Sequence, residues 1–133
     1  MKVLIVDADW RFAEQAGDFL ESHAHLVVHH NKADDAIDKA KHWQPDLVIL
    51  AAEFAQDASL VSSLYGASPR PAILLTDHMH RFDRAWRAWQ RCGDELLMKP
   101  IFKGEELQTA VVAALENAAA GAIMRRGQLA ASA

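Results

Sequence analysis

The sequence predicts an α/β fold in which helices cover both faces of a five-stranded parallel sheet. The first observation is that residues 47–50, which follow Pro45 and Asp46, are all apolar. An uninterrupted apolar run is typical of a strand that is buried on both faces at the centre of a parallel sheet. The second observation is that short apolar runs alternate with segments of helical periodicity, which favours a doubly wound sheet with right-handed crossovers.

Five short apolar runs predict the strands. They cover residues 3–6, 26–30, 47–50, 72–76 and 95–98. Between them, apolar residues at helical spacing predict helices. These helices cover about residues 12–20, 33–40, 58–65, 82–89 and 103–119. The acids of Asp7-Ala8-Asp9 can cap the first helix, and Ser68-Pro69-Arg70-Pro71 ends the third because proline cannot continue a helix.

The 133 residues correspond to about one domain. We predict that this domain occupies residues 1–120. After Ala118 the sequence is rich in small residues and has no apolar stripe, which indicates a frayed helix end or a tail or linker at residues 121–133. We therefore expect residues after about Gly121 to add little to stability.

Composition argues against several classes of protein. A formal net charge of −4 offers no basic patch for nucleic acid. The single cysteine, Cys92, cannot form an internal disulfide, which fits the reducing cytoplasm. The apolar run at residues 3–6 stops at Asp7, far short of a signal peptide or membrane span. We expect a cytoplasmic protein that needs no membrane, nucleic acid or cofactor.

In an open α/β sheet the functional groups lie beyond the carboxyl ends of the central strands. The residue that follows the central run 47–50 is Ala51. Its side chain has no nucleophile, no metal ligand and no titrating group. The usual position for chemistry therefore lacks a reactive group.

Four short motifs follow one another in the predicted strands and the turns behind them. They are Val3-Leu4-Ile5-Val6-Asp7, Pro45-Asp46-Leu47-Val48-Ile49-Leu50, Leu74-Leu75-Thr76 and Lys99-Pro100. In this order they resemble the receiver domain of bacterial two-component response regulators, over about residues 2–118. The resemblance implies a flavodoxin-like (βα)5 fold. It also implies that a partner histidine kinase passes a phosphoryl group to an aspartate that ends the third strand, beside a magnesium ion held by an acidic pair.

Only part of that phosphorylation site matches. Thr76 and Lys99 match the hydroxyl and the lysine that the resemblance implies, and Asp7 matches the first acid. Ala8 stands in place of the second acid, and Ala51 stands in place of the phosphoacceptor. Phosphoryl transfer needs the charge on three oxygens to be neutralised by a metal ion and fixed donors. We therefore expect no catalytic residues and no metal site of the family's kind.

Other acids near this crevice are alternatives. Asp9 caps the first helix or replaces the missing metal ligand. Glu53 is a solvated loop residue or leans in to pair with Lys99, and Asp57 lies several residues beyond the central strand. Without a phosphoryl group, we expect Lys99 and Asp7 to hold each other as a buried pair.

The sequence contains several histidines, which raises the question of a metal site. They are His23, His25, His29, His30, His42, His78 and His80. His29 and His30 point to opposite faces of a strand, and the pair at 78 and 80 has no accompanying acid or thiol cluster. We interpret them as solvated or capping residues.

Phe82, Trp86 and Trp89 recur at helical spacing in the predicted fourth helix. They pack in the core or form a partner face, since tryptophan is enriched at binding hot spots. The resemblance implies that the fourth helix, fifth strand and fifth helix form a docking face, in which Leu96 replaces an aromatic switch residue. Trp10 lies beside the crevice and is a candidate cover for it.

The resulting hypothesis is an atypical receiver domain that is not an enzyme and acts as a phosphorylation-independent protein-interaction module. Its partner would be a histidine kinase, a transcription or signalling protein, or a second copy that binds the face of the fourth and fifth helices. One alternative is a regulator that accepts a phosphoryl group on Glu53, Asp9 or Asp57. Another is a small-ligand sensor that uses the space left by Ala8 and Ala51.

Overall fold

The computed structural model describes the backbone of residues 1–132 and the side chains of residues 1–121. One parallel sheet forms its centre, with strand order β2-β1-β3-β4-β5. The strands are β1 (Lys2–Val6), β2 (Leu26–His30), β3 (Leu47–Ala51), β4 (Ala72–His78) and β5 (Glu95–Lys99). Every residue of β3 is buried, so the prediction of a central strand at this position is confirmed.

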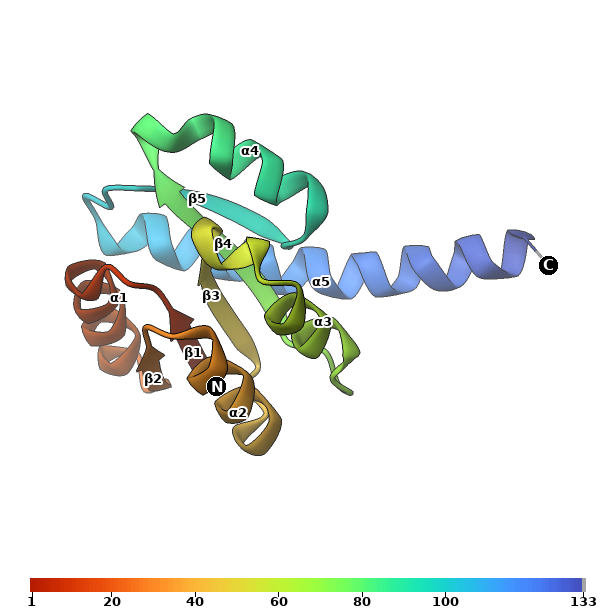
Figure 1. The fold of residues 1–133 in the computed structure, drawn as a ribbon, viewed down its shortest axis with the longest axis horizontal. Helices are drawn as coiled ribbons and strands as arrows, with labels where there is room; N and C mark the ends of the chain where they lie inside the picture. Colours follow the sequence, from red (N-terminus) through yellow and green to blue (C-terminus); the bar gives the residue numbers. More distant parts are fainter. Residues whose placement is uncertain (133) are drawn as a thin grey trace.

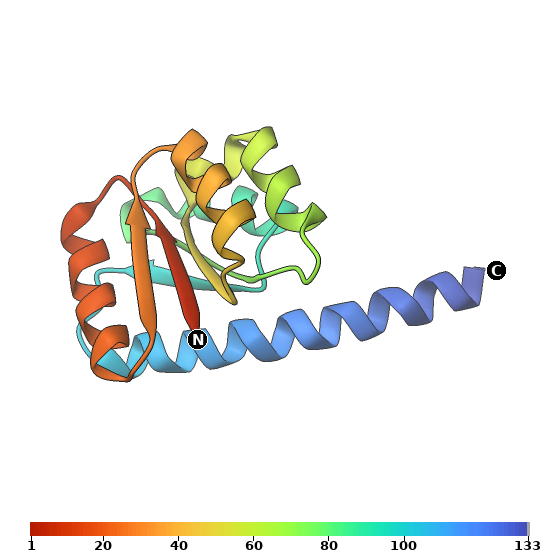
Figure 2. The same cartoon turned by 90° about the horizontal axis from the view of Figure 1, so that it is seen from below.

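Helices cover both faces of the sheet, as Figures 1 and 2 show. The α-helices are α1 (Trp10–Ser22), α2 (Ala33–Trp43), α3 (Ala58–Gly66), α4 (Phe82–Arg91) and α5 (Gly104–Ser132). Helices α1 and α5 pack on one face, with Val3 and Ile5 of β1. Helices α2, α3 and α4 pack on the other, with Leu4 and Val6. Side chains that alternate along each strand thus fill two separate cores, and the predicted fold class is confirmed.

Two short 3-10 helices lie at the carboxyl edge of the sheet, where the sequence predicts loops. They are η1 (Ala52–Gln56), which follows β3 directly, and η2 (Met79–Arg81), which follows β4. Strand β4 is also two residues longer than predicted, because Asp77 and His78 continue the pairing with Met98 and Lys99. Both differences place polar residues close to the crevice.

Helix α5 continues to Ser132, although its apolar stripe predicts an end near Ala119. Its final residues are mostly Ala, Leu, Met, Arg and Gln, which have high intrinsic helix propensity, and no proline interrupts them. Figure 2 shows that this part of the helix projects beyond the sheet. The boundary near residue 120 and the small contribution of the tail to stability stay predictions.

Candidate functional site

A cluster of buried residues, called the crevice below, lies where β1, β3, β4 and β5 end. The turn behind β1 provides Asp7, β3 ends in Ala51, β4 contributes Thr76 and β5 ends in Lys99. Ala51 and Thr76 are register partners on adjacent strands. All four residues are at most 5% exposed. The structure therefore brings these four predicted site residues together at the switch point of the strand order, where open α/β sheets bind ligands, whereas the predicted Ala8 and Glu53 are exposed.

Asp7 and Lys99 form a buried ion pair in this crevice. Lys99 Nζ donates to Asp7 Oδ2 at 2.6 Å, and the backbone N–H of Asp9 donates to Asp7 Oδ1 at 2.8 Å. Lys99 Nζ also lies 4.3 Å from the centre of the Phe12 ring. Both oxygens of Asp7 are thus engaged by the protein itself, which confirms the expectation that the two residues hold each other.

The donor set does not fit a magnesium ion. Mg²⁺ favours octahedral coordination by oxygen, with carboxylates as its main protein ligands. Ala8 and Ala51 bring methyl groups to the two positions where the resemblance implies carboxylates. Among residues 1–121, no three His, Cys, Asp or Glu side chains come together in a way that could hold a metal ion. The buried carboxylate of Asp7 already forms an ion pair with Lys99.

The solved structures that match this architecture include receiver domains of response regulators. No protein-family model and no curated protein matches the chain. The receiver domain of NtrX from Brucella abortus superposes with a TM-score of 0.73 at 21% identity, covering 86% of this chain and 98% of that one. A two-component response regulator from Clostridium difficile gives 0.70 at 21% identity, covering 87% and 96%.

The chain has the receiver-domain fold. A longer NtrX structure from Brucella abortus gives a TM-score of 0.78 at 20% identity. It matches 93% of this chain but only 29% of the NtrX chain, so the likeness is confined to one domain of that protein. Of the described helices, none combines the length and apolar character that crossing a membrane requires.

Thr76 is the hydroxyl-bearing residue at the end of the central strands, beside Ala51 in the strand register. Its side chain is fully buried, and Oγ1 has no hydrogen-bond partner among the described residues. A buried hydroxyl without a partner carries a desolvation cost of about 1–3 kcal/mol. The hydroxyl therefore adds nothing to the stability of this fold, although its position facing Ala51 matches the position that the resemblance implies.

The three alternative acids have other positions. Asp9 caps α1, since its Oδ1 accepts from Phe12 N–H at 3.2 Å, and its Oδ2 lies 3.9 Å from Lys99 Nζ and 3.6 Å from His78 Nε2. Asp57 caps α3 by accepting from Leu60 N–H at 2.9 Å. Glu53 is exposed on η1, and within the described residues the ion pairs of Lys99 are with Asp7 and Asp9. The alternative in which Glu53 pairs with Lys99 is wrong, because η1 turns Glu53 outward to solvent.

Asp77 is a buried acid that the sequence analysis missed. Its side chain is 2% exposed. Arg84 of α4 donates two hydrogen bonds to its carboxylate, from Nε to Oδ2 at 2.8 Å and from Nη2 to Oδ1 at 2.6 Å. Burial alone would raise the pKa of Asp77. The hydrogen bonds from Arg84 and from His78 N–H outweigh burial and hold this pKa below its ordinary value. The pair ties the end of β4 to α4. The signal in the sequence was Arg84, seven residues after Asp77. A helix that begins at Phe82 places Arg84 in its first turn, close to the end of β4.

Replacement of Asp77 by Asn should destabilise the fold by about 2 kcal/mol at pH 7, because hydrogen bonds to a charged group are lost. The folded pKa lies below the unfolded value of about 3.9, so the carboxylate contributes fully above that pH and loses its contribution as pH falls through the folded pKa. The deficit of Asp77→Asn should therefore shrink below about pH 4. Urea unfolding at several pH values measures the difference in the free energy of unfolding between the variant and the wild type. Asp83→Asn, an exposed neighbour on α4, is the control, and an equal deficit in both variants would contradict the assignment.

The predicted partner face is partly exposed. Phe82 is 56% exposed and Trp86 49% exposed, and their rings stack with centroids 6.5 Å apart. Trp89 and Leu96 are half-buried and pack against the core beneath α4. Trp10 is exposed at the start of α1, so it does not cover the crevice as a buried lid would. The face therefore consists of two exposed rings supported by two half-buried side chains.

Several histidines bind the backbone. His23 Nδ1 and His42 Nδ1 lie 2.9 Å and 2.8 Å from the carbonyl oxygens of Phe19 and Asp38, each near the end of a helix. His29 Nε2 contacts the carbonyl oxygen of Asp7 at 2.7 Å. The contacts of His23 and His42 agree with the interpretation of capping histidines.

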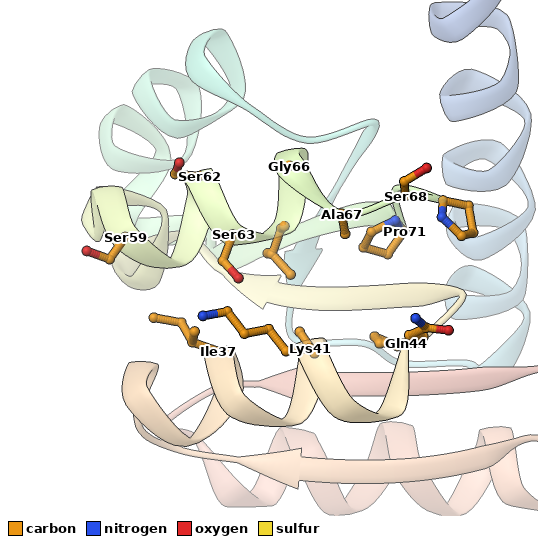
Figure 3. Close-up of a pocket in the computed structure, with 14 residues that line it drawn as sticks. Ile37, Lys41, Gln44, Ser59, Ser62, Ser63, Gly66, Ala67, Ser68 and Pro71 are labelled. Atoms are coloured by element: carbon orange, nitrogen blue, oxygen red, sulfur yellow. The ribbon is translucent and has the colours of Figure 1, made fainter.

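A separate groove of about 610 Å³ runs between α2 and α3. Figure 3 shows Ile37 and Lys41 of α2 facing Ser63 of α3 across it. The groove ends at Pro45 and Pro71, which precede β3 and β4 and therefore lie at the opposite edge of the sheet from the crevice. Lys41 is its one charged residue, so the lining offers hydroxyl groups but no acid, base or nucleophile pair.

Proposed function

We propose that this chain is a degenerate receiver domain of two-component signalling that acts as a phosphorylation-independent protein-interaction module. One observation carries the proposal: β3 ends in Ala51, while the lysine of the crevice is already paired with Asp7 at 2.6 Å. The crevice thus has no nucleophile to accept a phosphoryl group. Its likeness to response regulators supports the signalling role.

The position of α4 supports an output that needs no phosphoryl group. The carboxylate of Asp77 accepts hydrogen bonds from two donors of Arg84, and this contact joins the end of β4 to the first turn of α4. Thr76 and Asp77 are neighbours, so the hydroxyl position and the anchor of α4 belong to one rigid strand end. A fixed α4 presents Phe82 and Trp86 permanently.

The exposed rings of Phe82 and Trp86 favour a protein as the partner. Large aromatic side chains supply much of the binding energy at protein interfaces, and tryptophan is enriched among hot spots. Trp89 of α4 and Leu96 of β5 pack against the core and are only half-buried, so part of their apolar surface is also open to solvent. The partner is a signalling or transcription protein, such as a histidine kinase, or a second copy of the chain.

A double variant, Phe82→Ser with Trp86→Ser, tests this face. Affinity capture from an extract of the source cells, together with sedimentation equilibrium of the pure protein, should show a partner or a dimer for the wild type and loss of either in the double variant. Acetyl phosphate with magnesium should leave the captured set unchanged.

Trp10→Ser is the matched control, because Trp10 is 63% exposed and lies on α1, away from α4. It should retain the partner or the dimer. An unchanged partner set and unchanged mass in the double variant would contradict the assignment of this face. Capture that appears only after phosphodonor treatment would contradict phosphorylation independence.

A further inference from the structure

A second pocket, of about 580 Å³, lies between η1 and α4 and is lined mainly by arginine. Its guanidinium groups come from one face of α4 and the turn before it, at Arg81, Arg84, Arg87 and Arg91. Ala52 and Ala55 of η1 and Ala88 of α4 line it with small side chains. Helix α4 contacts η1, which is the short yellow helix after β3 in Figure 1. The stacked Phe82 and Trp86 lie on a different face of the same helix.

Only Arg84 among these four arginines has a contact that stabilises the fold. Arg84 holds Asp77 through Nε and Nη2, which leaves Nη1 for another acceptor. Those hydrogen bonds raise the pKa of Arg84, and the charge of nearby Glu53 raises it further to a smaller extent. No ion pair or side-chain hydrogen bond to a described residue is made by the guanidinium groups of Arg81, Arg87 and Arg91. Four arginines against the carboxylates of Asp77, Glu53 and Asp83 leave one positive charge in excess.

This arrangement is unfavourable for α4 by itself. Like charges three or four residues apart on a helix destabilise it by about 0.2–0.5 kcal/mol per pair. Helix α4 contains such pairs at 84 and 87 and at 87 and 91, and Asp83, four residues before Arg87, offsets only part of this repulsion. The chain as a whole carries a net charge of −4, so this concentration of cations is a local feature. An anionic ligand would convert the repulsion into binding energy.

We propose that the pocket between η1 and α4 binds a small molecule that carries at least two phosphate groups. Guanidinium groups form paired hydrogen bonds with phosphate oxygens, and the three arginines that have no partner among the described residues can each contact a phosphate oxygen. The volume lies within the range of small-molecule sites. The alanines leave room for the ligand next to the backbone of η1. This site is distinct from the crevice of Asp7 and Lys99, and its ligand binding does not depend on whether α4 docks a protein.

Calorimetric titration of the full chain with sodium tripolyphosphate, at an ionic strength of 0.15 M, tests the proposal. The wild type should bind tripolyphosphate, and orthophosphate should bind at least tenfold more weakly. Arg87→Gln and Arg91→Gln should each lower the affinity about tenfold, the effect of losing one charge-assisted contact. Both residues are exposed and unpaired, so their variants should fold, which circular dichroism checks. Arg84 is left unchanged because it anchors Asp77.

Arg11→Gln is the matched control, since Arg11 is exposed on α1 with no partner among the described residues. It should bind tripolyphosphate within twofold of the wild type. Absence of binding to the wild type, or an equal loss in Arg11→Gln, would overturn the site. Hexaglutamate that binds more tightly than tripolyphosphate, with the same dependence on Arg87, would overturn the small-molecule assignment in favour of an acidic peptide.

Discussion

Incubation of the wild-type protein with acetyl phosphate or a kinase and magnesium should leave it unlabelled. Ala51 has no oxygen to form an acyl phosphate, and Ala8 removes a carboxylate from a metal site that has few protein ligands. Lys99, which would otherwise contact the phosphoryl group, is bound to Asp7. Mass spectrometry of the intact protein detects labelling directly, because each phosphoryl group adds a fixed mass.

Restoring the missing groups should restore the reaction in steps. Ala51→Asp alone should give weak or no labelling. The metal site would then contain only two carboxylates, at positions 7 and 51, and the carboxylate of Asp7 is also paired with Lys99. Adding Ala8→Asp should be needed for appreciable labelling, with Thr76 and Lys99 as the donors. The double variant should also be slightly less stable at low magnesium, because it adds two carboxylates to the one already in the crevice.

A control for added charge is Ala8→Asp combined with Ala58→Asp, which places the second carboxylate on the exposed first residue of α3. This variant should stay unlabelled. Strong labelling of the wild type, mapped to Glu53, Asp9 or Asp57, would overturn the proposal of a degenerate receiver. The positions of these acids oppose such labelling, because Asp9 and Asp57 cap helices and Glu53 faces solvent.

Replacement of Asp7 by Asn should be the most destabilising single change considered, at about 3–5 kcal/mol. Lys99 is only 4% exposed, so removing the charge of Asp7 leaves a buried ammonium group without its nearest carboxylate. Asp9, at 3.9 Å and 32% exposed on its side chain, compensates only in part. For a domain of this size the loss corresponds to a fall in Tm on the order of 10 °C.

A second substitution separates the cost of an unpaired charge from the value of the pair. Asp7→Asn combined with Lys99→Met should recover most of the stability, because replacing both members of a buried pair by neutral groups is often close to neutral. Asp18→Asn, an exposed residue of α1 without a partner among the described residues, should change stability by less than about 0.5 kcal/mol. Failure of the double variant to recover would show that Lys99 contributes through packing on Phe12 instead of through charge.

The order of elements could be predicted because local patterns determine it. Side chains of the apolar runs at β1 and β3 point alternately to the two helix layers. Proline or glycine marks several boundaries between elements, so the order of strands and helices can be recognised from residues that are neighbours in the sequence. The ends were less predictable. Strand β4 runs past Thr76 because Asp77 is satisfied by Arg84, and a polar residue in isolation indicates the end of a buried strand.

The sequence by itself determined what this site lacks. A methyl group at Ala51 or Ala8 has the same chemistry in any conformation, so the absence of a nucleophile and of a second carboxylate follows from residue identity alone. Only the tertiary structure decided which charges meet. Lys99 reaches Asp7 across 92 positions of sequence and does not pair with Glu53, while the four arginines at 81–91 gather beside η1. The physical reason is that an ion pair depends on distances of a few ångströms between elements that are far apart in the chain, and periodicity carries no information about those distances.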